Sequence, residues 1–239
     1  MARMPRIVVP GVPLHVTQRG NNRQPIFFAD RDYARFLVDL REAAARHACA
    51  VHAYVLMTNH VHLLLTPSDT NGPARLMQAL GRRYVRYVNL RYARTGTLWE
   101  GRFRSALLDS DRYYFACSRY IEMNPVRAQL VRDPGEYRWT SFPRNAHGRP
   151  DAVVSPHPLY LALGTTDMNR QRAYRQLFGQ EPDAESVDSI RRGTRSGVAI
   201  GSDGFREDVR ATLARRVDRL GHGGDRRSST FRQSRGQSR

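Results

Sequence analysis

Two histidines one residue apart, set in an apolar run, are the first residues of this sequence that could do chemistry. His60 and His62 lie in the segment 57–66, Met-Thr-Asn-His-Val-His-Leu-Leu-Leu-Thr. On a β-strand successive side chains point to opposite faces, so the two imidazoles share one face while Val61 and Leu63 point into a core. Such a pair can hold a metal ion at two points. The alternative is a half-buried strand with two polar residues on its wet face.

A second cluster lies downstream, where Tyr120 is followed four residues later by Asn124. In a helix these two residues share one face, so a phenol and an amide oxygen would project together. A phenol with a reference pKa of about 10 is a poor nucleophile, but it can attack a phosphate that a metal ion polarises. An Asn oxygen beside two His nitrogens would suit Mg²⁺ or Mn²⁺. The alternative is that Tyr120 is a core aromatic and Asn124 only a helix cap.

The charge of the chain indicates a polyanionic partner. Among 239 residues, Lys+Arg total 39 against Asp+Glu 22, a formal net charge of +17, and every basic residue is an arginine. Nucleic acid is the commonest partner of so positive a surface, although codon bias explains the use of arginine in place of lysine better than function does. The only two cysteines, Cys49 and Cys117, exclude a disulfide framework and a thiolate zinc site. With no long apolar segment, we expect a soluble, cytoplasmic protein without a membrane span.

Hydrophobic periodicity predicts the elements that must position these residues. Alternation predicts strands and 3.6-residue spacing predicts helices, in the order β-α-β-β-α-β. The expected strands cover 14–18, 50–57, 60–66 and 103–108, and the expected helices cover 32–47 and a long segment after 71–73. That order predicts an α+β fold, a ferredoxin-like split β-α-β sheet with helices on one face and the other face open. An added helix over 109–123 carries Tyr120, Asn124 is placed to cap a short helix starting at Pro125, and a helical extension follows.

The sequence resembles a known family, the REP-associated tyrosine transposases. These are relatives of the insertion-sequence 200-like single-tyrosine HUH transposases. Four motifs in the expected order, between about residues 10 and 142, carry the resemblance. They are the opening His15-Val16-Thr17-Gln18-Arg19-Gly20-Asn21-Asn22-Arg23, the HUH-like Thr58-Asn59-His60-Val61-His62, the segment Leu98-Trp99-Glu100-Gly101-Arg102-Phe103 and the tyrosine motif Tyr120-Ile121-Glu122-Met123-Asn124-Pro125.

The resemblance implies an enzyme and assigns roles within it. His60 and His62 would be metal ligands, Tyr120 the nucleophile, and Asn124 would occupy the third-ligand position for Mg²⁺ or Mn²⁺. The implied substrate is single-stranded DNA with repetitive extragenic palindromic hairpins, cleaved and rejoined through a 5′-phosphotyrosine. We therefore expect a catalytic HUH domain over 1–145, a small helical accessory region over 146–220, and a disordered, phosphate-seeking basic tail over 221–239.

The expected DNA contacts are basic and aromatic side chains near these motifs. Arginines would bind the backbone and aromatic rings would stack on bases, although each one taken singly is more often a solvated arginine or a core aromatic. The candidates are Arg19, Arg23, Arg82, Arg83, Arg86, Arg102, Arg104, Trp99 and Phe103.

Two other functions remain open on sequence alone. His15-Val16-Thr17 is an HxT element of the kind that occurs in pairs in metal-free two-histidine phosphoesterases, but no second HxT or HxS accompanies it. The chain could instead be a non-catalytic protein that binds DNA hairpins. The sequence leaves open whether it acts as a monomer or a homodimer.

Overall fold

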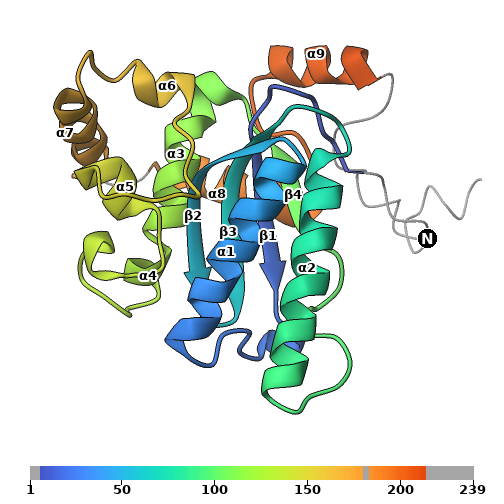
Figure 1. The fold of residues 1–239 in the computed structure, drawn as a ribbon. Helices are drawn as coiled ribbons and strands as arrows, with labels where there is room; N and C mark the ends of the chain where they lie inside the picture. The colour runs from blue at the N-terminus through green and yellow to red at the C-terminus, as the bar shows by residue number, and fades with distance from the viewer. Residues whose placement is uncertain (1–5, 180–182, 214–239) are drawn as a thin grey trace, which may run out of the picture.

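The centre of the molecule is a four-stranded antiparallel sheet, seen in a computed structural model that describes residues 6–179 and 183–213 (Figure 1). Its strands are β1 (Leu14–Arg19), β2 (Cys49–Met57), β3 (His60–Pro67) and β4 (Arg104–Leu107), in the spatial order β2-β3-β1-β4. Thr58 and Asn59 form the tight hairpin between β2 and β3. This is the predicted α+β fold with split β-α-β topology, in which the two central strands are β1 and β3.

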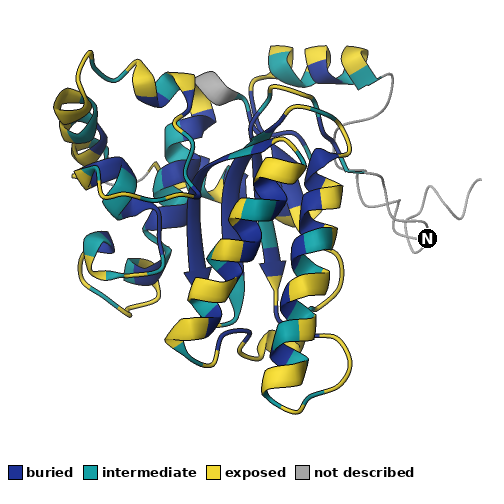
Figure 2. Ribbon diagram, viewed as in Figure 1, coloured by how far each residue is buried: buried dark blue, intermediate teal, exposed yellow. Residues whose placement is uncertain are grey.

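The first face of the sheet is covered by α1 (Asp30–Arg46) and α2 (Gly72–Arg91), which lie in front of it in Figure 1. Each helix buries one stripe of apolar side chains at helical spacing, such as Phe36 and Leu40 on α1 and Leu80 and Tyr84 on α2. The outward stripes of both helices are exposed, while the strands behind them are mostly buried (Figure 2). These helices and the sheet enclose the larger of the hydrophobic cores.

The prediction that the second face of the sheet is open was wrong. It is partly covered by α3 (Ser110–Glu122) and α8 (Ala184–Ser196), which run behind the sheet in Figure 1. The reason is apolar content, because Tyr114, Cys117 and Ile121 on α3 and Ile190 on α8 are buried in a second core with Leu64 of β3. Local periodicity shows only that these helices have an apolar stripe, and only their packing shows which surface buries it.

The remaining helices follow α3 in the chain. They are α4 (Asn124–Arg127), α5 (Phe142–His147), α6 (Pro158–Leu161), α7 (Asp167–Phe178) and α9 (Asp203–Leu213), with short 3₁₀ turns η1 (Asn21–Arg23) and η2 (Pro134–Glu136). The expected accessory region thus contains α6 to α9, and the expected basic tail over 221–239 lies outside the described residues. No helix in the described part of the chain is both long and apolar enough to cross a membrane.

Two local predictions about this second half need correction. Asn124 does not cap α4 with its side chain, since it is the first helical residue and Met123 occupies the cap position. The sequence Asn-Ala-His-Gly-Arg-Pro predicts a linker over 145–150. That segment is instead helical in its first half, because α5 extends to His147 and ends on the left-handed Gly148. Asn145 is buried there, and its amide donates to the carboxylate of Glu122 at 3.0 Å.

Glu122 joins three helices in the interior. It is fully buried at the end of α3, and its carboxylate also accepts hydrogen bonds from Ser141 at 2.5 Å and from Tyr174 of α7 at 2.7 Å. Burial raises the pKa of Glu122 to about 7, although these three donors act in the opposite direction. The attachment of α5 and α7 to α3 therefore depends on a carboxyl group that titrates near neutrality.

We expect this carboxyl to make the free energy of unfolding depend on pH. The pKa of Glu122 is about 7 in the folded protein and 4.5 in the unfolded chain. The contribution of Glu122 to the free energy of unfolding is therefore fully present below pH 4.5 and is lost as the pH rises through about 7. The difference amounts to at most about 3 kcal/mol. Denaturant unfolding of the wild type and Glu122→Gln at pH 5 and pH 8 measures it, and the wild type should lose more stability than the variant. Equal losses in the two proteins would contradict the prediction.

Candidate active site

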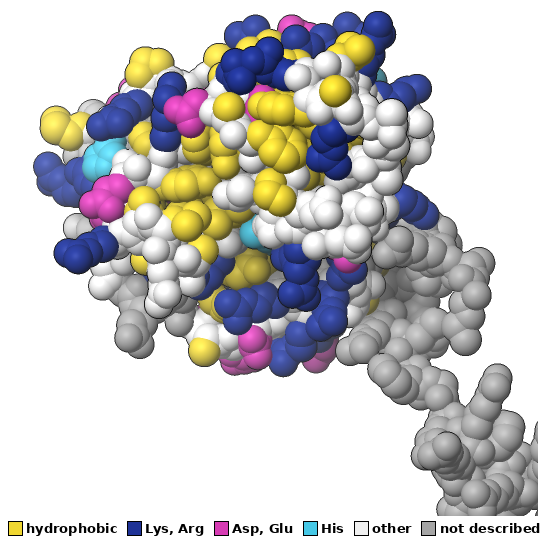
Figure 3. All heavy atoms as spheres, turned by 90° about the horizontal axis from the view of Figure 1, so that it is seen from below, with side chains coloured by type: hydrophobic (Ala, Val, Ile, Leu, Met, Phe, Trp, Pro, Cys, Tyr) yellow, Lys and Arg dark blue, Asp and Glu magenta, His cyan; other side chains and the backbone are white. Residues whose placement is uncertain are grey.

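A cavity of about 400 Å³ opens on the second face of the sheet, between the ends of β1 and β3 and the helices α3 and α8. Half of the residues that line it are arginines, namely Arg19, Arg23, Arg102, Arg104, Arg191 and Arg195. Arginine side chains are spread over the end of the molecule shown in Figure 3, and several of them lie together below its centre. Glu100 is the only carboxylate in the lining, so this cavity would attract an anion such as phosphate.

Strand register brings His15 and His62 together at this cavity, and His60 lies next to His62 without lining the cavity. Because β1 and β3 are antiparallel neighbours, Thr17 lies opposite His62, and the side chain of His15 lies on the same face as that of His62. The rings of His60 and His62 are 5.0 Å apart between centroids, as expected for alternate residues of one strand. Val61 and Leu63 point into the core on the other face, as predicted. His15 stacks on His62 with ring centroids 5.0 Å apart.

The three imidazoles are neutral at physiological pH because they are removed from water. Burial lowers the pKa of His60 to about 4 and that of His15 to about 3, and it lowers the pKa of His62 well below the ordinary value. The nearby cations Arg19 and Arg127 act in the same direction. A metal ion requires neutral imidazole, so the lone pairs needed for ligation are present over a wide pH range.

Tyr120 faces the histidines from α3. Its ring meets His62 and His15 edge-on, with centroid distances of 5.8 and 5.7 Å. The guanidinium of Arg127 lies 4.4 Å above the ring centroid and donates to the backbone carbonyl of Tyr120 at 2.7 Å. A second cation, Arg191 of α8, lies 5.9 Å from the same ring. The phenol is thus held between neutral imidazoles and positive charge, an arrangement that favours negative charge on its oxygen during a reaction.

Two of the predicted metal ligands fit that role. His60 uses Nδ1 in a hydrogen bond of 2.7 Å with Oδ1 of Asn59, and His62 uses Nδ1 against His15 at 2.8 Å, so both Nε2 atoms remain available. Asn124 is less well placed, because the helix breaks at Met123 between it and Tyr120. Its side chain makes no hydrogen bond to either histidine in the described part of the chain. Within these residues no three His, Cys, Asp or Glu side chains group as a metal site.

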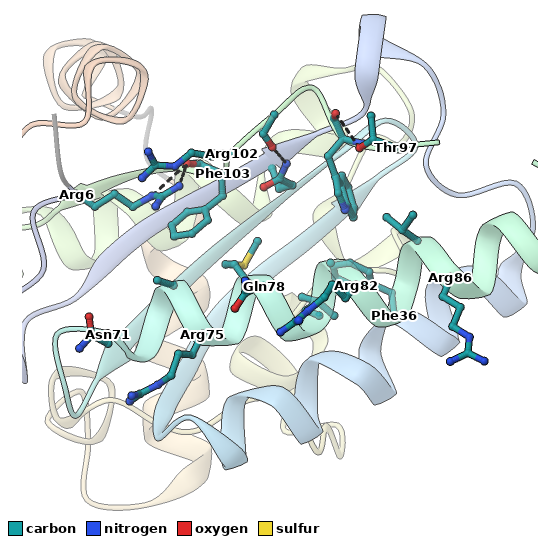
Figure 4. A pocket seen from close by; sticks show the side chains of 18 residues that line it. Arg6, Phe36, Asn71, Arg75, Gln78, Arg82, Arg86, Thr97, Arg102 and Phe103 are labelled. Atoms are coloured by element: carbon teal, nitrogen blue, oxygen red, sulfur yellow. Dashed lines mark hydrogen bonds between the residues drawn. The ribbon is translucent and has the colours of Figure 1, made fainter. Parts of the chain in front are cut away.

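Several predicted DNA contacts line a second and larger cavity, of about 870 Å³, between α2 and the loop before β4. Figure 4 shows Arg82 and Arg86 projecting from α2 and Arg102 and Phe103 on the opposite side. Trp99 also lines it, with a buried Nε1 that has no hydrogen-bond partner among the described residues. The backbone of Arg19 accepts from Glu100, which fixes this loop to the end of β1.

Two predicted contacts are already engaged within the protein. Arg83 lies outside both cavities and pairs with Glu42 of α1 at 2.6 Å and with buried Asp39 at 3.4 Å. The ring of Phe103 is covered by the guanidinium of Arg6, 3.6 Å from its centroid. Arg102, by contrast, lines both cavities and is exposed.

Six residues of the smaller cavity were not among the predicted site residues: His15, Thr17, Glu100, Arg191, Thr194 and Arg195. The alternation of β1 was a usable signal for His15, because it predicts that His15 lies on the face opposite to Leu14 and Val16. Glu100 lies within a predicted motif. Nothing local in the sequence indicates Arg191 or Thr194, which reach the cavity only because α8 packs against β4 and α3.

Comparison with known proteins finds a family model that is similar to part of this chain. Residues 8–124 match the model of the IS200-like transposases. Among solved structures, a REP-associated tyrosine transposase bound to a REP hairpin resembles this chain at a TM-score of 0.54 and 17% identity, covering 66% of this chain and 93% of that one. A transposase-like protein of Deinococcus radiodurans, 18% identical over 54% of this chain and 92% of its own, has a TM-score of only 0.36.

No curated protein sequence matches the chain. At such low identities the structural likeness concerns the fold alone, and it agrees with the split β-α-β sheet described above. The matched segment runs from just before β1 to Asn124, and so includes both histidines of the pair and Tyr120. Residues 8–124 of this chain are therefore similar to the IS200-like transposases.

Proposed function

We propose that this protein is a metal-dependent transesterase that cleaves and rejoins single-stranded DNA at palindromic hairpins, with Tyr120 as its nucleophile. The observation that carries the proposal is the position of Tyr120, whose ring lies 5.8 Å from that of His62 at an arginine-lined cavity. A phenol, two imidazoles with available Nε2 atoms and several guanidinium groups are together suited to attack on a phosphodiester.

In the proposed reaction the phenol oxygen of Tyr120 attacks phosphorus and the bond to the 3′ oxygen breaks. The products are a 5′-phosphotyrosine and a strand ending in a 3′-OH, while the phenol proton is released. Attack of a 3′-OH on the phosphotyrosine reverses these bond changes and joins two strands. Because the phosphoester bond is conserved in the covalent link, joining needs no nucleotide cofactor. Arg127 and Arg191 flank the Tyr120 ring and would stabilise the negative charge that develops.

His60 and His62 would hold the metal, with Asn124 or a phosphate oxygen of the DNA completing its shell. A bound Mg²⁺ or Mn²⁺ would draw charge from a non-bridging oxygen of the scissile phosphate. Burial keeps both imidazoles uncharged, because it lowers the pKa of His60 to about 4 and that of His62 well below its ordinary value. Arg102 and Arg104 at the rim would bind the flanking phosphates.

The larger cavity is suited to the DNA that flanks the cleaved bond. Arg102 lines both cavities, so a single strand leaving Tyr120 would meet Arg102 first and then Arg82 and Arg86 on α2. Trp99 offers an aromatic surface beside these arginines. We propose that these four residues bind the strand next to the scissile phosphate.

The two alternative functions are less consistent with the geometry. A metal-free two-histidine phosphoesterase needs a free imidazole nitrogen on His15, yet both of its nitrogens are engaged, at 2.7 Å by Thr194 and at 2.8 Å by His62. A protein that only binds hairpins would not need a phenol and neutral imidazoles arranged around one cavity. The substitutions below distinguish all three.

Replacing Tyr120 by phenylalanine should abolish strand cleavage and the covalent adduct while leaving DNA affinity nearly unchanged, since only the hydroxyl is removed. The assay incubates the protein with a single-stranded palindromic oligonucleotide and Mn²⁺, then detects the adduct by denaturing electrophoresis and mass spectrometry. Tyr113→Phe is the matched control, because Tyr113 is buried on the same helix away from the histidines. Excess EDTA should stop the wild-type reaction.

Three results would contradict this proposal. An adduct placed on another residue would refute the role of Tyr120, and full activity in EDTA would favour the metal-free phosphoesterase. Tight hairpin binding by the wild type with no cleavage under any metal would favour the non-catalytic protein.

Replacing Arg82 and Arg86 together by methionine should weaken the binding of single-stranded DNA and flatten its salt dependence. Each phosphate contact on a single strand contributes about 0.7 to the slope of log K against log salt, so two lost contacts should lower the slope by about 1.4. Fluorescence anisotropy at a series of salt concentrations measures the slope.

Arg83→Met is the matched control for this experiment. Arg83 neighbours Arg82 in sequence but pairs with Asp39 and Glu42, so its loss should lower the free energy of unfolding by roughly 1 kcal/mol and leave the salt slope largely unchanged. A slope that falls with Arg83→Met and not with the double variant would place the DNA on the other side of α2.

A further inference from the structure

Three buried side chains from three elements form a chain of hydrogen bonds that the proposed reaction does not use. Oγ1 of Thr194, on α8, lies 2.7 Å from Nδ1 of His15, and Nε2 of His15 lies 2.8 Å from Nδ1 of His62. The exposed fractions of His15, Thr194 and His62 are 1%, 4% and 6%. Since these side chains are almost entirely buried, the hydrogen bonds of their polar atoms are mainly those that they make with one another.

A neutral imidazole carries one N–H and one acceptor nitrogen. This chain of hydrogen bonds therefore has two possible arrangements of the histidine tautomers, which we call its two settings. In the first setting His62 donates from Nδ1 to His15, His15 donates from its own Nδ1 to Thr194, and Nε2 of His62 keeps a free lone pair. In the second setting Thr194 donates to His15, His15 donates to Nδ1 of His62, and the proton of His62 is on Nε2. Only the first setting allows Nε2 of His62 to bind a cation.

The hydrogen bonds of Asn59 fix the tautomer of the neighbouring His60. The side-chain amide of Asn59 donates from Nδ2 to the backbone carbonyl of Arg23 at 2.9 Å, so Oδ1 of Asn59 must be the acceptor for Nδ1 of His60. That hydrogen bond leaves Nε2 of His60 free. Each histidine of the pair therefore has a dedicated partner at Nδ1, and the partner of His62 is His15.

The position of Thr194 is held firmly by the packing of α8. The backbone of Ile200, just after α8, accepts from Asp109 and donates to Leu107 at 2.8 Å each, which fixes this part of the chain to the end of β4. Gly193 packs so closely on the Ile200 side chain that a methyl group at residue 193 would collide with it. Thr194 is therefore presented to His15 by a rigid support.

We propose that His15 is a positioning residue that keeps the proton of His62 on Nδ1 and its Nε2 open to a cation, and that Thr194 anchors His15 for this purpose. This inference rests on the proposed metal-binding role of His62. In this proposal the hydroxyl of Thr194 on α8, 179 positions from His15 in the sequence, helps to orient the proposed metal ligand His62 through His15. Partners of this kind on metal-binding histidines typically change metal affinity by about 10- to 100-fold.

The discriminating variant is Thr194→Val, which keeps the shape of the side chain and removes the hydroxyl. Without an acceptor, a proton on Nδ1 of His15 would be buried and unpaired, whereas an unprotonated Nδ1 at that place costs less. The chain should therefore change to the second setting. Thr194→Ser keeps the hydroxyl and is the matched control.

Two measurements on the full chain test the proposal. Nitrogen-15 spectra of the metal-free protein identify which ring nitrogen of each histidine bears the proton, and calorimetric titration with Mn²⁺ gives the affinity. We expect His62 to be protonated on Nδ1 in the wild type and in Thr194→Ser. In Thr194→Val the proton should move to Nε2, and Mn²⁺ affinity should fall about tenfold. Binding of single-stranded DNA in EDTA should be retained, which shows that the variant is folded.

The outcomes separate this inference from the proposed function. If Thr194→Val keeps wild-type Mn²⁺ affinity while His62→Ala loses it, the role of His15 and Thr194 is refuted and the metal site stands. If His62→Ala binds Mn²⁺ as tightly as the wild type, the metal site itself is refuted. A proton on Nε2 of His62 in the wild-type protein would also overturn the proposal.

Discussion

The two central strands, β1 and β3, present alternate side chains to the two faces of the sheet, and the rest of the structure depends on this constraint. Leu14 and Val16 on β1 and Val61 and Leu63 on β3 all point into the core beneath α1 and α2. Their alternate neighbours, among them His15 and His62, must then lie together on the second face. A slip of one residue in the pairing of β1 with β3 would send the imidazoles into the apolar core, so the burial of the aliphatic residues fixes the site.

On the second face of the sheet, the buried interior and the exposed rim differ in charge. Its inner part holds imidazoles whose pKa values are lowered by burial, while its rim is formed by exposed arginines such as Arg102 and Arg195. Neutral imidazole nitrogens inside and cations outside are consistent with the proposed binding of a metal ion and a polyanion. The arginines keep their charge at any physiological pH, so the same arrangement operates unchanged over a broad range.

The helices beyond the family match are tied into this centre by polar contacts as well as by apolar ones. Glu122 at the end of α3 binds α7 through Tyr174, and His15 on β1 binds α8 through Thr194. Both links are buried, so the removal of either partner would leave a polar group without a hydrogen bond. The matched segment 8–124 and the later helices thus share interior contacts.

The sequence alone determined the order of the elements, the face shared by His60 and His62, and the helix that bears Tyr120, because these follow from periodicities of two and 3.6 residues within short segments. Tertiary structure decided what covers the second face, which arginines of α2 turn toward Asp39 and Glu42, and which side chain meets His15. Those outcomes depend on contacts between residues far apart in the chain, such as His15 and Thr194. Local patterns show that a helix has an apolar stripe, but only packing decides which surface buries it.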